Sequence, residues 1–141
     1  MMGVDTNVLV RYLVNDDVKQ SQLAQQFFQN HCSLNEPCYI SSIVLCELVW
    51  VLESAYRYSS VQVADVLQQL METQGLEIES SGNAWQAVAQ YRKGFDFSDA
   101  LIGLNNQSSG CSVTLTFDKK ATRLNGFKKL AAFLEDEPAK K

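Results

Sequence analysis

The chain has few of the residues on which several common classes of protein depend. It holds one histidine and two prolines among 141 residues, and no apolar run approaches the roughly 20 residues that a membrane-spanning helix needs. A single histidine, His31, excludes acid–base catalysis by a pair of histidines. The start, MMGVDTN, has no basic region before an apolar stretch, so we see no signal peptide and expect a cytoplasmic protein.

The four cysteines form no CxxC pair. Cys46 lies in an apolar helical segment, where a free thiol behaves as a small hydrophobic side chain. Cys32 and Cys38, even with His31, match no established zinc pattern. We therefore expect reduced thiols and no zinc.

Length and composition are those of an ordinary globular domain. Hydrophobic residues make up 46% and charged residues 20% of the 141 residues, which is enough for a core in one domain. We predict a single domain over residues 1–134 and a disordered tail over 135–141, where the sequence reads EDEPAKK.

Short β-like runs alternate with longer helical ones along the chain, which favours a parallel sheet with helices on both faces. We predict strands at 2–5, 38–40, 76–80 and 112–117, and an edge strand at 127–130. We predict helices at 6–14, 16–30, 42–56, 61–71, 83–93 and 98–108.

Five acidic residues stand at the ends of these apolar segments or interrupt them. They are Asp5, Glu47, Asp96, Asp99 and Asp118. Carboxylates at the ends of parallel strands can converge on one point, where they repel each other until a cation neutralises them. The sequence therefore predicts a Mg²⁺ or Mn²⁺ site.

Each acid also has a simpler explanation. Asp5, Asp96 and Asp118 can cap helices, and Asp99 can lie in a first helical turn. Glu47 emerges from an apolar helical face, although a narrow solvent-exposed strip of the helix beside Cys46 and Ser54 would also accommodate it. Four separate caps explain less than one common site.

The net charge of −4 does not favour a nucleic-acid partner by itself. With the five acids set aside, eleven acidic residues remain against twelve Lys and Arg. Since a bound cation reverses the local sign of charge, a polyanionic substrate stays admissible.

Four segments carry a resemblance to a known family. DTNVLVRYL, SSIVLCELVWVL, DFSDALIGL and TLTFDKKA resemble, in order and spacing, the acidic motifs of the PIN-domain family, specifically its VapC-like toxin ribonucleases. The similarity spans roughly residues 2–130. It implies a three-layer α/β/α sandwich with a central parallel sheet, a homodimer, Mg²⁺ or Mn²⁺, an RNA substrate and a small antitoxin protein as partner.

The resemblance also implies roles for individual residues. The catalytic and metal-binding acids would be Asp5, Glu47, Asp99 and Asp118, with Asp96 as a further metal ligand. Supporting polar groups would come from Thr6, Asn7, Ser41 and Thr116. The short lead of MMGV before Asp5 departs from the family pattern and leaves little apolar length for the first strand.

The chemistry expected of such a site is hydrolysis by water on a hard cation, with one or two metals and products ending in 5′-phosphate and 3′-hydroxyl groups. Basic residues near the motifs are either phosphate contacts or ordinary solvated charges. They are Arg11, Arg92, Lys93, Lys119, Lys120 and Arg123.

A dimer is also expected from surplus apolar side chains. Trp50, Leu52, Leu67 and Leu70 cannot all lie on one face of a small sheet, and a surplus apolar patch usually marks an interface.

Three other functions remain open. A catalytically silent binding module would keep the fold but lose an acid, and none is missing. An RNA maturation or decay nuclease would lack an antitoxin. A receiver-like phosphoryl-transfer domain fits poorly, because Glu47 lies in the middle of a helix.

Overall fold

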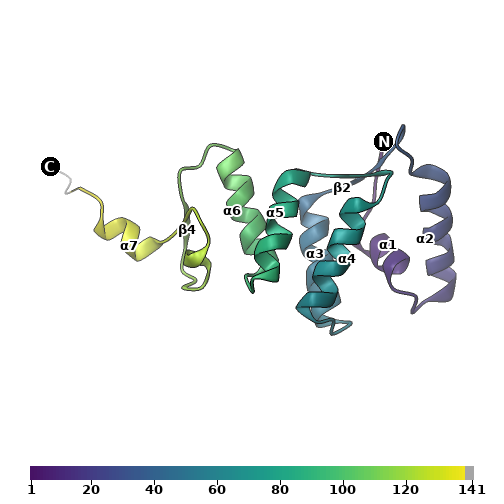
Figure 1. Cartoon of the computed structure of the whole chain (residues 1–141), viewed down its shortest axis with the longest axis horizontal. Coiled ribbons are helices and arrows are strands. Elements are labelled where there is room, and N and C mark those ends of the chain that lie inside the picture. The colour runs from purple at the N-terminus through teal and green to yellow at the C-terminus, as the bar shows by residue number, and fades with distance from the viewer. Residues whose placement is uncertain (139–141) are drawn as a thin grey trace.

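The computed structural model describes residues 1–138, in which short strands alternate with longer helices (Figure 1). The elements are β1 (Met2–Gly3), α1 (Thr6–Leu13), α2 (Val18–His31), β2 (Cys38–Ile40), α3 (Ser42–Ser54), α4 (Ser60–Glu72), β3 (Leu76–Ile78), α5 (Ser81–Arg92), α6 (Phe97–Ser108), β4 (Thr114–Thr116), the 3-10 turn η1 (Ala121–Arg123), β5 (Phe127–Lys129) and α7 (Leu130–Glu135). No helix in this part of the chain is both long and apolar enough to cross a membrane.

The predicted helices and strands are all present, with ends that differ by a few residues. The helix predicted from residue 16 begins at Val18, because the Asp17 carboxylate caps it by accepting a hydrogen bond from the Gln20 amide. Ser59 and Gln62 form a reciprocal capping box that starts α4. The sequence did not predict η1 or α7, and α7 extends to Glu135, where we had placed the start of a disordered tail. The last three residues of that tail lie outside the described residues.

All strands pair in parallel, which confirms the α/β fold class, but they form two sheets. One sheet has the order β1-β2-β3, with Gly3 opposite Tyr39 and Ile40 opposite Ile78. The other joins β4 to β5. The β4–β5 sheet lies at the opposite end of the molecule from the N-terminus, with α5 and α6 between them (Figure 1).

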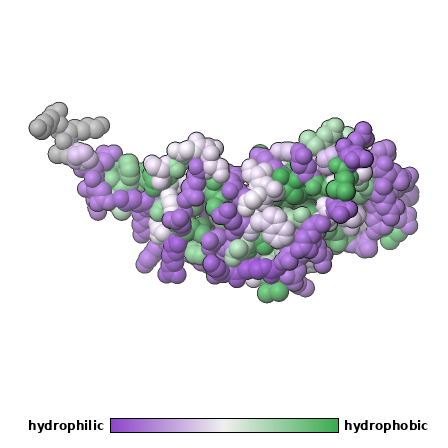
Figure 2. Space-filling model, turned by 45° about the horizontal axis from the view of Figure 1, so that its top comes forward, coloured by the Kyte–Doolittle hydropathy of each residue, from purple (hydrophilic) through white to green (hydrophobic). Residues whose placement is uncertain are grey.

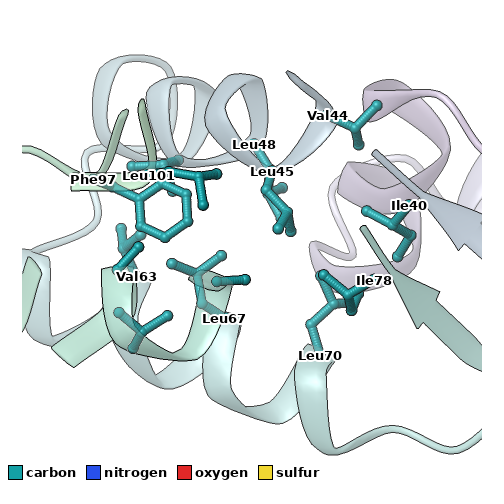
Figure 3. Packing of buried hydrophobic residues seen from close by; sticks show 14 of the residues in the cluster. Ile40, Val44, Leu45, Leu48, Val63, Leu67, Leu70, Ile78, Phe97 and Leu101 are labelled. Carbon is teal, nitrogen blue, oxygen red and sulfur yellow. The ribbon is translucent and has the colours of Figure 1, made fainter. Parts of the chain in front are cut away.

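The core lies between helices α3, α4 and α6 and the three-stranded sheet (Figure 3). Phe97 of α6 is fully buried against Leu45 and Leu48 of α3 and Leu67 of α4. Burying an aliphatic or aromatic side chain of this size stabilises the fold by about 1.5–3 kcal/mol. α6 is therefore firmly fixed to the N-terminal part of the molecule.

The core corrects the sequence argument for a surplus apolar patch. Leu52, Leu67 and Leu70 are all fully buried within the chain, whereas Trp50 is 68% exposed. The helices α3 and α4 bury these leucines against α5, α6 and the sheet, an arrangement that helical periodicity alone does not reveal.

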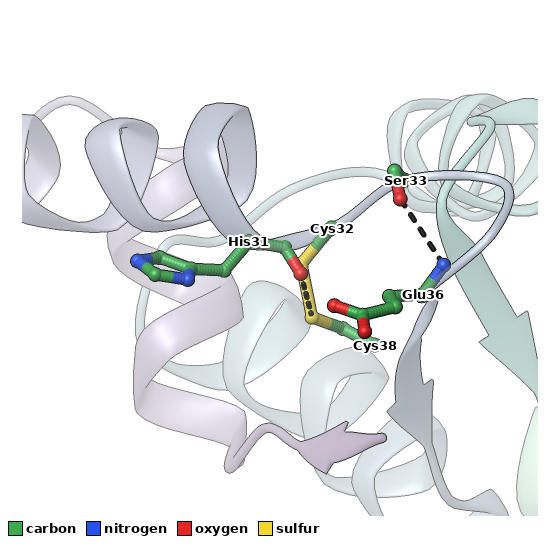
Figure 4. Close-up of a disulfide and its surroundings, with 5 residues drawn as sticks. All are labelled: His31, Cys32, Ser33, Glu36 and Cys38. Carbon is green, nitrogen blue, oxygen red and sulfur yellow. Dashed lines mark hydrogen bonds between the residues drawn. A yellow bond between two sulfur atoms is a disulfide. The ribbon is translucent and has the colours of Figure 1, made fainter.

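The expectation that all cysteines are reduced is wrong for one pair. Cys32 and Cys38 form a disulfide that joins the end of α2 to β2, with Cα atoms 5.3 Å apart (Figure 4). The intervening turn is held by a hydrogen bond from the Glu36 amide to the Ser33 hydroxyl. Cys46 and Cys111 are free thiols. No sequence spacing indicated the pair, because the turn that brings the two residues together is irregular.

Candidate active site

The first group of predicted site residues lies where β1 passes into α1. Asp5 caps α1, and one of its carboxylate oxygens accepts a hydrogen bond of 2.8 Å from the Thr6 amide. The buried Thr6 donates its hydroxyl to Glu47 Oε1 of α3, at 3.3 Å. Thr6 thus links the first strand end to Glu47, whose carboxylate is exposed. A hollow of about 350 Å³ opens at this point.

Arg11 lies at the edge of the same hollow. Its guanidinium donates to Asp16 at 3.0 Å and to the Tyr56 hydroxyl at 3.3 Å. Tyr56 in turn donates to Asp16 at 2.7 Å. This hydrogen bond and the charge of Arg11 lower the pKa of Asp16. The sequence analysis missed Asp16 and Tyr56, since they lie 40 residues apart and in no motif.

The second group lies at the start of α6 and after β4. Asp96 caps α6 by accepting a hydrogen bond of 2.9 Å from the Asp99 amide. Asp118 accepts a hydrogen bond of 2.9 Å from the Lys120 amide, and its own amide donates to the Thr116 hydroxyl at 3.0 Å. Burial, followed by the negative charges of Asp96 and Asp118, raises the pKa of Asp99. Asp99 therefore lies in a negative field made by two other carboxylates.

The two groups do not converge on one point. Within residues 1–138, no three Asp, Glu, His or Cys side chains are close enough to hold one metal ion. Carboxylate oxygens are the ligands that Mg²⁺ and Mn²⁺ prefer, so the chemistry of the donors fits. Their placement within one chain does not fit, because β1 pairs with β2 and β4 pairs with β5, which leaves the two strand ends apart.

The other predicted supporting groups have separate positions. The Ser41 hydroxyl caps α3 by accepting a hydrogen bond of 3.3 Å from the Val44 amide. Asn7 is exposed and lines the hollow beside Asp5. Ser41 thus serves as a helix cap, whereas Asn7 faces the candidate site.

The predicted RNA contacts also divide into engaged and exposed groups. Arg92 donates to Asp65 at 2.9 Å and to Gln68 at 2.9 Å, both on α4, and so joins α5 to α4. Arg92 is exposed as well, as are Lys93, Lys119, Lys120 and Arg123. Lys119, Lys120 and Arg123 lie within five residues after Asp118, so the second acidic group has the denser positive charge beside it in the sequence.

Comparison with known proteins agrees with the fold class. The family model described as the PIN domain matches residues 2–126, a segment that holds all five acids. The chain belongs to the PIN-domain family. It is also similar to the VapC ribonuclease of Aquifex aeolicus (strain VF5), with 24% identity over 136 residues, which cover 96% of this chain and 99% of that protein.

Proposed function

We propose that this protein is a Mg²⁺- or Mn²⁺-dependent endoribonuclease that hydrolyses RNA phosphodiester bonds and acts as the toxin of a type II toxin–antitoxin pair. The observation that carries the proposal is that the PIN-domain match covers residues 2–126, a range that contains Asp5, Glu47, Asp99 and Asp118. Similarity to a VapC ribonuclease over nearly the whole length of both chains supports the same activity.

The chain's own groups suit this role. Thr6 orients the Glu47 carboxylate toward the end of β1, and Thr116 fixes the turn that carries Asp118. Burial, followed by the negative charges of Asp96 and Asp118, raises the pKa of Asp99, and a bound cation would relieve the repulsion between these carboxylates. In nucleases such cations neutralise phosphoryl oxygens and activate water.

The proposal extends to partners and location. The substrate is RNA, the exposed cations after Asp118 contact its phosphates, and a small antitoxin protein restrains the enzyme. The active form is a homodimer and works in the cytoplasm.

Metal dependence is the most direct test. The purified full chain should cleave single-stranded RNA in Mg²⁺ or Mn²⁺, lose this activity in EDTA, and regain it when the metal is added in excess. Products should carry 5′-phosphate and 3′-hydroxyl ends. Asp99→Asn, purified in parallel, is the matched control, because a contaminating nuclease would remain in its preparation. Cleavage that is unchanged in EDTA, or equal in Asp99→Asn, would contradict the proposal.

A further inference from the structure

Two strands of this chain each have an unpaired edge. The Val4 amide donates to the Tyr39 carbonyl of β2 at 3.2 Å, so the peptide groups of Gly3 point to the other edge of β1. The Thr114 amide donates to the Gly126 carbonyl beside β5 at 2.7 Å, so the Leu115 amide points away from β5. Within residues 1–138 neither edge has a strand beside it. Open edges of this kind are templates for pairing with another chain.

A large groove lies alongside the open edge of β1. It has a volume of about 770 Å³ and runs between β1 and the helices α1 and α2. Apolar side chains line much of it, including Val8, Phe27 and Leu23, which is 66% exposed. The space beside β1 is thus both unpaired and apolar.

The C-terminal unit, residues 114–135, has exposed apolar side chains of its own. Phe117 is 87%, Leu134 is 54% and Leu115 is 42% exposed, and α7 contains no buried residue. Figure 2 shows hydrophobic surface over the end of the molecule that holds β2 and α1, and smaller hydrophobic areas at the C-terminal end. The groove and the C-terminal unit therefore both present apolar side chains at the surface.

The C-terminal unit is held against α6, away from its own groove. It is fixed to α6, because the Phe127 ring packs so closely on Gly103 that a Cβ there would come within 2.3 Å, and because Asn106 donates to the Thr114 hydroxyl at 3.0 Å. α6 is in turn held in the core by Phe97 and Leu101, which are 0% and 2% exposed. The N-terminus and β4 lie on opposite sides of α5 and α6 (Figure 1).

We propose that β4 of one chain pairs in parallel with β1 of a second copy, and reciprocally, so that each active site is shared between two chains. The sheet β3-β2-β1 then continues into β4 and β5 of the second copy. Asp118 of the second copy joins Asp5 and Glu47 at one point, which the single chain does not achieve. The catalytic consequence of this inference rests on the proposed function. Because the pairing of strands is reciprocal, it gives a closed two-fold dimer.

Mixed dimers of two inactive variants test the shared site. Asp5→Asn and Asp118→Asn, each with its own tag, are co-expressed, and the mixed dimer is isolated through both tags. One of its two sites then has both wild-type acids and the other has both substitutions. We expect about half of the wild-type activity per dimer, from the symmetry of the assembly. If each chain closes its own site, every site has one substitution and the mixed dimer stays inactive, which overturns the proposal.

Molecular mass gives a second test that needs no RNA cleavage. Leu115→Pro removes the amide hydrogen on the open edge of β4, whereas Leu115→Val keeps it. Light scattering should give a dimer for the wild type and Leu115→Val and a monomer for Leu115→Pro, with equal helix content by circular dichroism. A monomeric or larger wild-type assembly, or a dimeric Leu115→Pro, overturns the proposed pairing of β4 with β1 of a second copy. If Leu115→Pro is misfolded, the activity of the mixed dimer decides. If the wild type and both variants have the expected molecular masses but the wild type cuts no RNA, the proposed function fails and the pairing of strands between two chains stands.

Discussion

Asp96 and Asp99 lie three residues apart at the start of α6, but their carboxylates have different surroundings. Asp96 accepts the Asp99 amide hydrogen and so satisfies a backbone donor that a helix leaves free. Asp99 is partly buried between the charges of Asp96 and Asp118. The sequence could not separate the two roles, because D-F-S-D fits both a cap and a pair of ligands.

The first prediction at this scale separates these two aspartates. Asp96→Ala should lower the free energy of unfolding by about 0.5–2 kcal/mol, as expected for a lost cap, and leave much of the RNA cleavage. Asp99→Asn should abolish cleavage without destabilising the protein. Urea unfolding and cleavage rates of both variants give the comparison. An inactive but fully stable Asp96→Ala would show that Asp96 belongs to the metal site.

The stability of Asp99→Asn should depend on pH in a defined direction. Because the pKa of Asp99 is raised in the folded protein, the folded state binds this proton more tightly than the unfolded chain. The carboxylate therefore lowers stability as pH rises from the ordinary aspartate value of about 3.9 through the raised pKa. Without metal, Asp99→Asn should be more stable than the wild type near neutral pH, and the difference should shrink toward acid pH.

At the scale of elements, the disulfide fixes the connection between α2 and β2. The peptide segment around Cys32 also packs closely against the turn before β3, where a Cβ on Gly75 would come within 2.8 Å of the Cys32 carbonyl oxygen. Gly75 has a φ of +88°, which side chains disfavour. The junction therefore combines a covalent link with tight backbone packing.

Reduction of this disulfide should destabilise the protein modestly. The link closes a short loop, with a sequence separation of 6, for which chain entropy gives about 2 kcal/mol. Urea unfolding with and without dithiothreitol measures this difference. Cys32→Ala is the control, since its stability should not respond to the reductant. An equal response in Cys32→Ala would trace the effect to Cys46 or Cys111 instead.

At the scale of the whole molecule, the exchange of strands links folding to association. If the C-terminal unit folds onto a second copy, the apparent Tm should rise with protein concentration. For a dimer of this size the rise is about 2–3 °C for each tenfold increase. Calorimetry over a range of concentrations measures it. The Tm of Leu115→Pro should not change, and a concentration-independent Tm for the wild type would contradict the exchange.

The sequence by itself determined the helices and strands, their parallel arrangement and the family. These follow from local signals, namely the period of apolar residues and the order of four acidic motifs. Asp5 and Glu47 line the same hollow, and Thr6 donates a hydrogen bond to each of them.

Only the tertiary structure decided which strands meet. The pairing of β4 with β5, the open edge of β1 and the link between Cys32 and Cys38 depend on how the chain is arranged in three dimensions, which no periodicity encodes. Apolar side chains such as Phe117 show that a surface must be covered, but not by which chain. Strand pairing is set by backbone groups that every residue shares, so the sequence places the acids at strand ends while the assembled sheet determines whether they converge.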